Sequence, residues 1–137
     1  MAFIAILATL VLISLLGSIV FTRRLHARQR SVVGDRPNGD LAKSLIAQGV
    51  KREVSCCVVE ILRGYHAADV VPHPDDSLWD FMRIDAEELE FITGDALRRL
   101  RLPLSDNDLD AAPVTVADFA MWLDRHHRAL AKQSMPA

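Results

Sequence analysis

The feature that most constrains this chain is a run of twenty residues without a charge, AFIAILATLVLISLLGSIVF, at positions 2–21. At a rise of 1.5 Å per residue, a helix of this length spans about 30 Å, which matches the hydrocarbon core of a bilayer. A backbone that crosses this core must satisfy its own hydrogen bonds, so the run is expected to be helical. The sequence therefore predicts a single transmembrane helix at the N-terminus.

Two other interpretations of this run have less support. A secretory signal peptide would carry a basic segment before a shorter apolar core and a small-residue cleavage site after it, whereas here TRRLHARQR follows the run directly. A helix that is apolar all round could also lie inside a globular core, but a chain of 137 residues builds too small a domain to enclose it.

Basic side chains flank the run on its C-terminal side only. The flank contains four arginines: Arg23, Arg24, Arg28 and Arg30. The positive-inside rule then places the N-terminus outside and the rest of the chain in the cytoplasm. These guanidinium groups can also contact anionic lipid headgroups. We expect residues 1–27 to form the anchor and its flank, and residues 28–39, which contain SVVGDRPNG, to form a flexible tether.

From Asp40 onward, apolar residues recur at intervals of three to five positions, which predicts helices. The first helical stretch begins at Asp40 as N-cap and ends near Gly64, with Gly49 as a break between two shorter helices. The next helix begins at Asp85, where Glu88 is the capping-box partner. Pro103 is expected to stop this helix.

The last helix is predicted from Thr115 as N-cap with Asp118 at the capping-box position. Residues 104–110 are expected to form a single helical turn, and no segment has the alternating pattern of a strand. The sequence therefore predicts an all-α protein, with a helical domain over residues 40–132 and a disordered tail over residues 133–137.

Charge is distributed unevenly along the chain. Residues 1–36 carry five arginines and one aspartate, a net of +4; because the whole chain is −2, residues 37–137 carry −6. Between positions 69 and 95 there are nine acidic residues and one basic residue, Arg83. Such a block argues against nucleic acid and favours a basic protein partner, although a solvated surface would show the same pattern.

The sequence contains no pattern typical of a metal site or an active site. Cys56 and Cys57 are adjacent, so we expect buried thiols rather than a disulfide or a zinc site. His126 and His127 point about 100° apart on a helix and cannot chelate one ion together. No nucleophile elbow, phosphate-binding glycine loop or HExxH motif is present, so no enzyme activity is predicted.

Residues from about 53 to 130 resemble the acyl carrier protein superfamily. The resemblance lies in a helix ending in VVEILRGY, an acidic proline-containing loop, the segment DSLWDFMRID, an acidic-headed helix, LPLSDND, and TVADFAMWL. It implies a bundle of three main helices plus one short helix. Trp79 is then expected to plug the bundle beneath the long loop, and Trp122 to lie either at the edge of the core or in an exposed contact.

The resemblance also raises the question of a prosthetic group. In carriers, a serine at the start of the second helix holds 4′-phosphopantetheine. If that helix begins at Asp85, the matching residue is Ala86, which has no hydroxyl. The triplet Asp76-Ser77-Leu78 lies one or two turns too early, so Ser77 is expected to be a turn hydroxyl paired with Asp80, and no cofactor is predicted. The alternative is a functional carrier with 4′-phosphopantetheine on Ser77, delivering acyl groups at the inner membrane.

In the family, the acidic start of the second helix docks onto basic patches of partner enzymes. The matching carboxylates here are Asp85, Glu87, Glu88 and Glu90. The same side chains would also stabilise the helix through its dipole, without any partner. The chain thus resembles the bacterial acyl-carrier-like proteins of unknown function that lack the prosthetic serine, which implies a bacterial inner membrane for its span. The prediction is a membrane-tethered, non-catalytic binding module that contacts lipids through one span and a basic protein through this helix. The oligomeric state is left open.

Overall fold

The computed structural model describes residues 1–34, 36, 39–103 and 112–135. These residues form five α-helices and one short 3-10 helix, and they contain no β-strand. The elements are α1 (Ala2–Val33), α2 (Leu41–Ala47), α3 (Arg52–Leu62), η1 (Arg63–Tyr65), α4 (Ala86–Arg99) and α5 (Val116–Gln133). The predicted all-α class is confirmed for the part of the chain that the structure describes.

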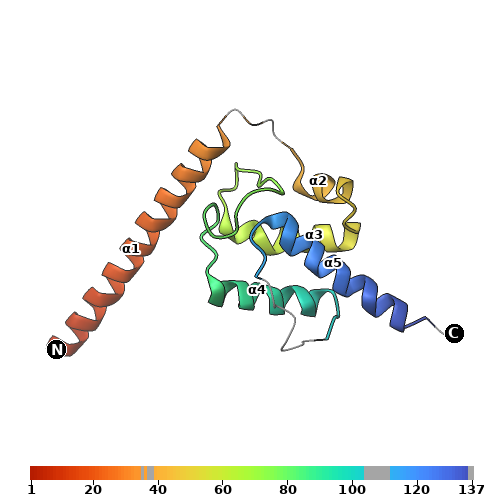
Figure 1. Cartoon of the computed structure of the whole chain (residues 1–137). Helices are drawn as coiled ribbons and strands as arrows, with labels where there is room; N and C mark the ends of the chain where they lie inside the picture. Colours follow the sequence, from red (N-terminus) through yellow and green to blue (C-terminus); the bar gives the residue numbers. More distant parts are fainter. Residues whose placement is uncertain (35, 37–38, 104–111, 136–137) are drawn as a thin grey trace.

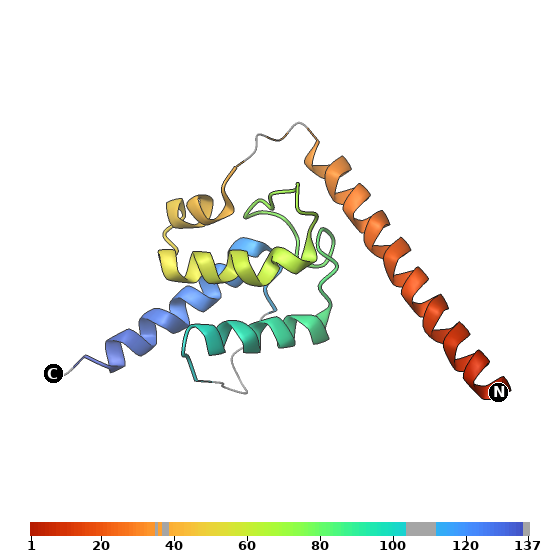
Figure 2. The same cartoon turned by 180° about the vertical axis from the view of Figure 1, so that it is seen from behind.

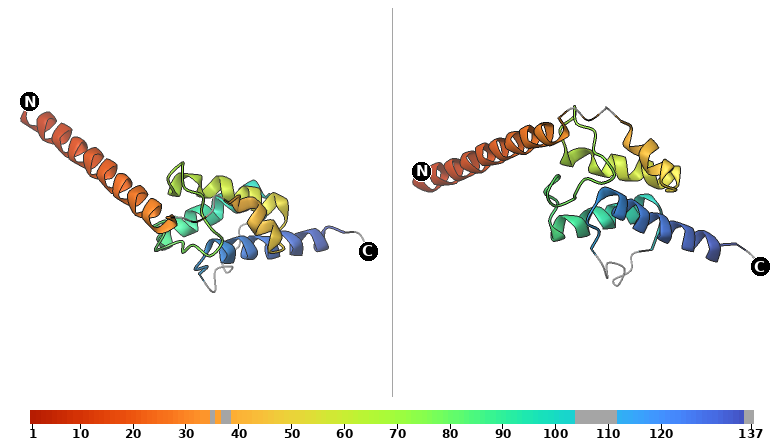
Figure 3. Two further views of the ribbon diagram at one scale, coloured as in Figure 1. Left: turned by 90° about the horizontal axis from the view of Figure 1, so that it is seen from above. Right: turned by 45° about the horizontal axis from the view of Figure 1, so that its top comes forward.

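α1 is a long rod that meets the rest of the protein only near its C-terminal end (Figures 1, 2 and 3). Residues 1–24 are exposed, and α1 is long and apolar enough to cross a membrane. The helix continues past residue 27 to Val33, so the tether expected over residues 28–39 is wrong for its first six residues. The extension stays helical because it packs on the domain, where Gln29 is buried and Val33 lies against the core.

α3 lies at the centre of the domain and packs against α2, α4 and α5. The largest apolar side chains that are fully buried among these helices and the adjoining loop are Leu45, Leu62, Met82, Ile92, Phe119 and Leu123. Gly49 separates α2 from α3 at a φ of 95°, a left-handed conformation that glycine adopts without steric cost. The break predicted at this glycine is confirmed.

The capping residues predicted from sequence begin the helices that they were assigned to. Asp40 accepts a hydrogen bond from the Lys43 backbone at the start of α2. Asp85 and Thr115 open α4 and α5 with complete capping boxes. The helical turn expected over residues 104–110 lies outside the described residues, as does the end of the expected tail.

The loop of residues 66–85, called the long loop below, folds onto the bundle. Its buried apolar residues are Ala67, Val70, Pro72, Pro74, Leu78, Phe81, Met82 and Ile84. The expectation that Trp79 plugs the bundle is wrong, since its neighbours on both sides take the buried positions and Trp79 stays 54% exposed. Trp122 is buried at the edge of the core. The two cysteines also differ from expectation, because Cys57 is buried but Cys56 is exposed.

Candidate functional site

The first turns of α4 hold the four carboxylates that the sequence singled out, and we call this surface the acidic start of α4. Asp85 accepts a hydrogen bond from the Glu88 backbone N–H at 2.8 Å, and Glu88 accepts one from the Asp85 backbone N–H at 3.4 Å. These two side chains therefore cap the helix. Glu87 and Glu90 take no part in the cap, and both are exposed.

Two aromatic residues border the acidic start of α4. Tyr65, at the end of η1, is partly buried. Burial is the main cause that raises the pKa of Tyr65, and the nearby carboxylates of Glu88 and Asp85 raise it further. Phe91 lies one turn after Glu87 and is 69% exposed. Sequence reasoning missed Phe91, although its position off the inner stripe of α4 was a usable signal.

Ser77 lies nine positions before the first residue of α4, Ala86, and not at a helix start. Its hydroxyl oxygen accepts a hydrogen bond from the Asp80 backbone N–H at 3.0 Å, the turn role expected for it. An isolated bridge pairs Ser77 with Thr115. Asp76, which precedes it, accepts two hydrogen bonds from Arg36 and one from the His73 backbone. The triplet thus fastens the long loop to the start of α5 and to the segment after α1.

The arginines that follow the apolar run have different environments. Arg23, Arg24 and Arg28 are exposed. Arg30 instead donates two hydrogen bonds to Asp69 in the long loop, at 2.8 and 3.0 Å. These hydrogen bonds hold the pKa of Asp69 below its usual range. One of the four expected lipid contacts is therefore an ion pair with the protein's own domain.

A polar contact that the sequence did not reveal joins α1 to the long loop. The Gln29 side chain is buried, and its amide nitrogen donates to the carbonyl oxygens of Tyr65 and Phe81 at 2.9 and 3.1 Å. Its amide oxygen accepts the Ala67 backbone N–H at 3.0 Å. We call this set of hydrogen bonds the Gln29 clamp. No local pattern marks it, because its partners are backbone groups more than 30 positions away.

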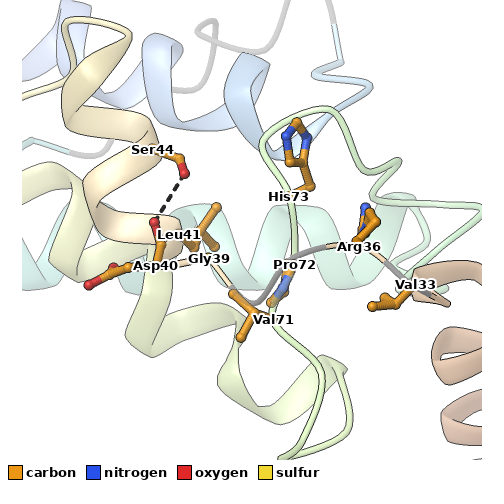
Figure 4. A pocket seen from close by; sticks show the side chains of 9 residues that line it. All are labelled: Val33, Arg36, Gly39, Asp40, Leu41, Ser44, Val71, Pro72 and His73. Carbon is orange, nitrogen blue, oxygen red and sulfur yellow. Dashed lines mark hydrogen bonds between the residues drawn. The ribbon is translucent and has the colours of Figure 1, made fainter.

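A cavity of about 270 Å³ lies between the end of α1, the start of α2 and residues 71–73, as Figure 4 shows. Its apolar lining includes Val33, Leu41 and Val71. Its polar side chains already have protein partners, since Arg36 pairs with Asp76 and the Ser44 hydroxyl donates to the Asp40 carbonyl at 3.1 Å. The cavity therefore defines no particular ligand chemistry.

The residues that the structure describes include no group of three His, Cys, Asp or Glu side chains placed to hold a metal ion. His127 instead lies 3.3 Å from the Glu53 carboxylate, and His126 shares a hydrogen bond with the Trp122 carbonyl. Burial raises the pKa of the Cys57 thiol to about 11, which keeps it protonated at neutral pH.

No family model, no curated protein and no solved structure matches this chain. The resemblance to acyl carrier proteins therefore depends on the short sequence motifs alone.

Proposed function

We propose that this chain is a non-catalytic binding module, held at a bacterial inner membrane by α1, whose cytoplasmic domain binds a basic protein through the acidic start of α4. The anchoring part is supported by the length and apolar character of α1 and by the arginines after residue 21. The acyl-carrier-like arrangement of α3, α4 and α5 remains part of the proposal.

The observation that carries the proposal is that only two of the four carboxylates at the start of α4 cap the helix. Asp85 and Glu88 already satisfy the helix start. The stabilising effect of the helix dipole on a charge fades beyond the first turn, so it does not account for Glu90. Helix stability does not explain Phe91 either, because the exposed position of this residue leaves a large apolar ring in water. An exposed aromatic residue directly after Glu90 and one turn after Glu87 makes a surface suited to a basic partner that also offers an apolar contact.

The alternative, a carrier with 4′-phosphopantetheine on Ser77, has less support. The Ser77 hydroxyl is engaged by the Asp80 backbone, and the Asp76 carboxylate beside it is engaged by Arg36. An arm at this position would have to leave from the middle of a folded loop. Ala86, at the start of α4, offers no hydroxyl in its place.

The test is photo-crosslinking from position 91 of the full chain in native membranes. A discrete adduct is expected at Phe91, and Glu87→Lys with Glu90→Lys should reduce it at least tenfold, because two attractions become repulsions. Both substitutions leave the capping pair of α4 intact. The matched control reverses Glu53 and Asp75, which are exposed carboxylates outside α4. An adduct equally sensitive to the control, or no adduct at all, contradicts the proposal.

A further inference from the structure

The Gln29 clamp fixes the long loop to α1 just beyond the apolar run. Gln29 is 1% exposed, and all three of its hydrogen bonds go to backbone groups of the segments around residues 65–67 and 81. A buried amide with its donors and acceptor paired in this way is costly to separate, because the buried backbone groups would be left without hydrogen-bond partners.

Contacts on both sides of the clamp strengthen the attachment. Arg30, one residue after Gln29 on α1, forms a bidentate ion pair with Asp69 in the long loop. Beyond the helix, Arg36 forms a second bidentate pair with Asp76, and its guanidinium carbon lies 5.8 Å from the centre of the Phe81 ring. The end of α1 and the long loop are therefore joined at three places, by Gln29, Arg30 and Arg36, although the chain between them is long.

The clamp also fixes how far the loop lies from the membrane. Gln29 follows Phe21, the last residue of the apolar run, by eight residues, or about 12 Å of helix. The headgroup region on each side of a bilayer is about 5–8 Å thick. Figures 1, 2 and 3 show the end of the long loop and the start of α4 on the side of the domain nearest α1, with the C-terminal end of α5 on the far side. With Phe21 at the edge of the hydrocarbon core, Gln29 lies about 4–7 Å beyond the headgroup region along the helix axis, and the clamp holds the loop at this residue.

Trp79 is the residue of this loop with an apolar ring left uncovered. It is 54% exposed, whereas Leu78, Phe81 and Met82 beside it are at most 7% exposed. Tryptophan favours the headgroup region, where its ring meets apolar chains and its N–H meets water. The acidic character of the loop is reduced by the arginines that pair with Asp69 and Asp76.

We propose that residues 77–84 of the long loop lie on the bilayer surface, with the Trp79 ring in the lipid headgroup region, held there by the Gln29 clamp. The proposal rests on the membrane anchoring by α1 proposed above, but not on any protein partner. The domain would then have one fixed face toward the lipid instead of moving freely on a tether.

The experiment uses the full chain in phosphatidylcholine–phosphatidylglycerol vesicles, with lipids brominated near the glycerol end of their acyl chains as quenchers. Subtracting the emission of Trp79→Phe from that of the unmodified chain isolates Trp79 from the buried Trp122. Brominated lipid should reduce Trp79 emission roughly twofold and leave Trp122 emission nearly unchanged. Co-sedimentation with alkali-washed vesicles reports insertion of α1 separately.

A clamp variant and a matched control complete the design. Gln29→Leu should reduce the quenching of Trp79, because only the Arg30–Asp69 and Arg36–Asp76 pairs then hold the loop, while the protein still sediments with vesicles. Gln48→Leu, at an exposed position after α2, should behave as the unmodified chain. The emission maximum of Trp122 confirms that the domain of each variant is folded. Unquenched Trp79 in the inserted, unmodified chain overturns the proposal, and so does full quenching in a folded Gln29→Leu variant. Failure to sediment would overturn the anchoring by α1 and this proposal with it.

Discussion

The Asp124 carboxylate ties α5 to the turn between α2 and α3, and its removal is the most informative perturbation of the domain. One oxygen accepts the Lys51 backbone N–H at 3.0 Å, at the start of α3, where no local side chain caps the helix. The other accepts from Arg128 at 2.6 Å, and Arg128 also donates to the Gly49 carbonyl at 2.9 Å. The Asp124 side chain is only 11% exposed, so these bonds are shielded from water.

The expected magnitude follows from these two hydrogen bonds. Asp124→Ala leaves the Lys51 N–H without its acceptor, at about 1–3 kcal/mol, and removes a charge-assisted bond. Arg128 is half-exposed and can bind water after the substitution, so the loss of its hydrogen bond adds a free-energy cost near the lower end of the same range. The sum is about 3 kcal/mol, a large fraction of the ~5–15 kcal/mol that holds a domain folded. Asp124→Asn keeps an acceptor for Lys51, so its cost should be near 1 kcal/mol.

The effect should depend on pH. Burial alone raises the pKa of Asp124, but the hydrogen bonds from Lys51 and Arg128 together bring it below its usual value. A carboxyl with a lowered folded pKa stabilises the protein above its unfolded pKa, about 3.9, and loses that contribution as pH falls through the folded pKa. The stability difference between the natural protein and Asp124→Asn should therefore be full at neutral pH and should shrink in acid.

These stability differences are measured by urea unfolding of the full chain in detergent micelles. The near-ultraviolet circular dichroism of Trp122, on the same helix as Asp124, reports the unfolding. Asp75→Ala is the matched control, since the Asp75 side chain is 82% exposed and should change stability by less than about 0.5 kcal/mol. An Asp124→Ala variant as stable as this control would refute the reasoning. A stability difference that grows as the solution is acidified would refute it as well.

Two further predictions concern single side chains. At neutral pH a maleimide should modify Cys56 and leave Cys57, because burial raises the pKa of the Cys57 thiol to about 11; mass spectrometry of the folded protein checks this, and equal labelling would contradict the structure. Ser77→Ala should cost about 1 kcal/mol of stability, since the Asp80 N–H loses its acceptor. The intact mass of the natural protein co-expressed with a phosphopantetheinyl transferase should not change, and an added arm on Ser77 would establish the carrier alternative instead.

The parts of this fold that the sequence predicts are those decided by neighbours in the chain. Asp85 with Glu88, and Thr115 with Asp118, form capping boxes within four residues, so their signatures can be read locally. Gly49 marks its turn for the same reason, because the left-handed conformation is a property of one residue. Each of these predictions is confirmed.

The parts that the sequence did not predict depend on contacts between distant segments. Gln29 is a polar residue in a segment that the sequence assigns to a tether. Only the fold brings the carbonyl of Phe81, 52 positions away, to its side chain. Asp124 caps α3 from α5, across 73 positions. For Trp79 the sequence predicts a place beneath the long loop, whereas the loop geometry gives the buried positions to its neighbours. Local pattern carries none of this information.

The same long-range contacts change the meaning of the charge asymmetry along the chain. The acidic block and the basic N-terminal segment are partly each other's counterions, because Asp69 pairs with Arg30 and Asp76 pairs with Arg36. Other carboxylates of the block serve the structure of α4: Asp85, Glu88 and Asp95, the last through an ion pair with Arg99. A basic partner is therefore not needed to explain the block as a whole. On α4, Glu90 beside Phe91 has no role in the helix start, and Glu87, which the helix dipole also stabilises in the first turn, is exposed one turn before Phe91. The proposed docking surface is therefore narrower than the sequence implied, and reversing the charges of Glu87 and Glu90 tests it.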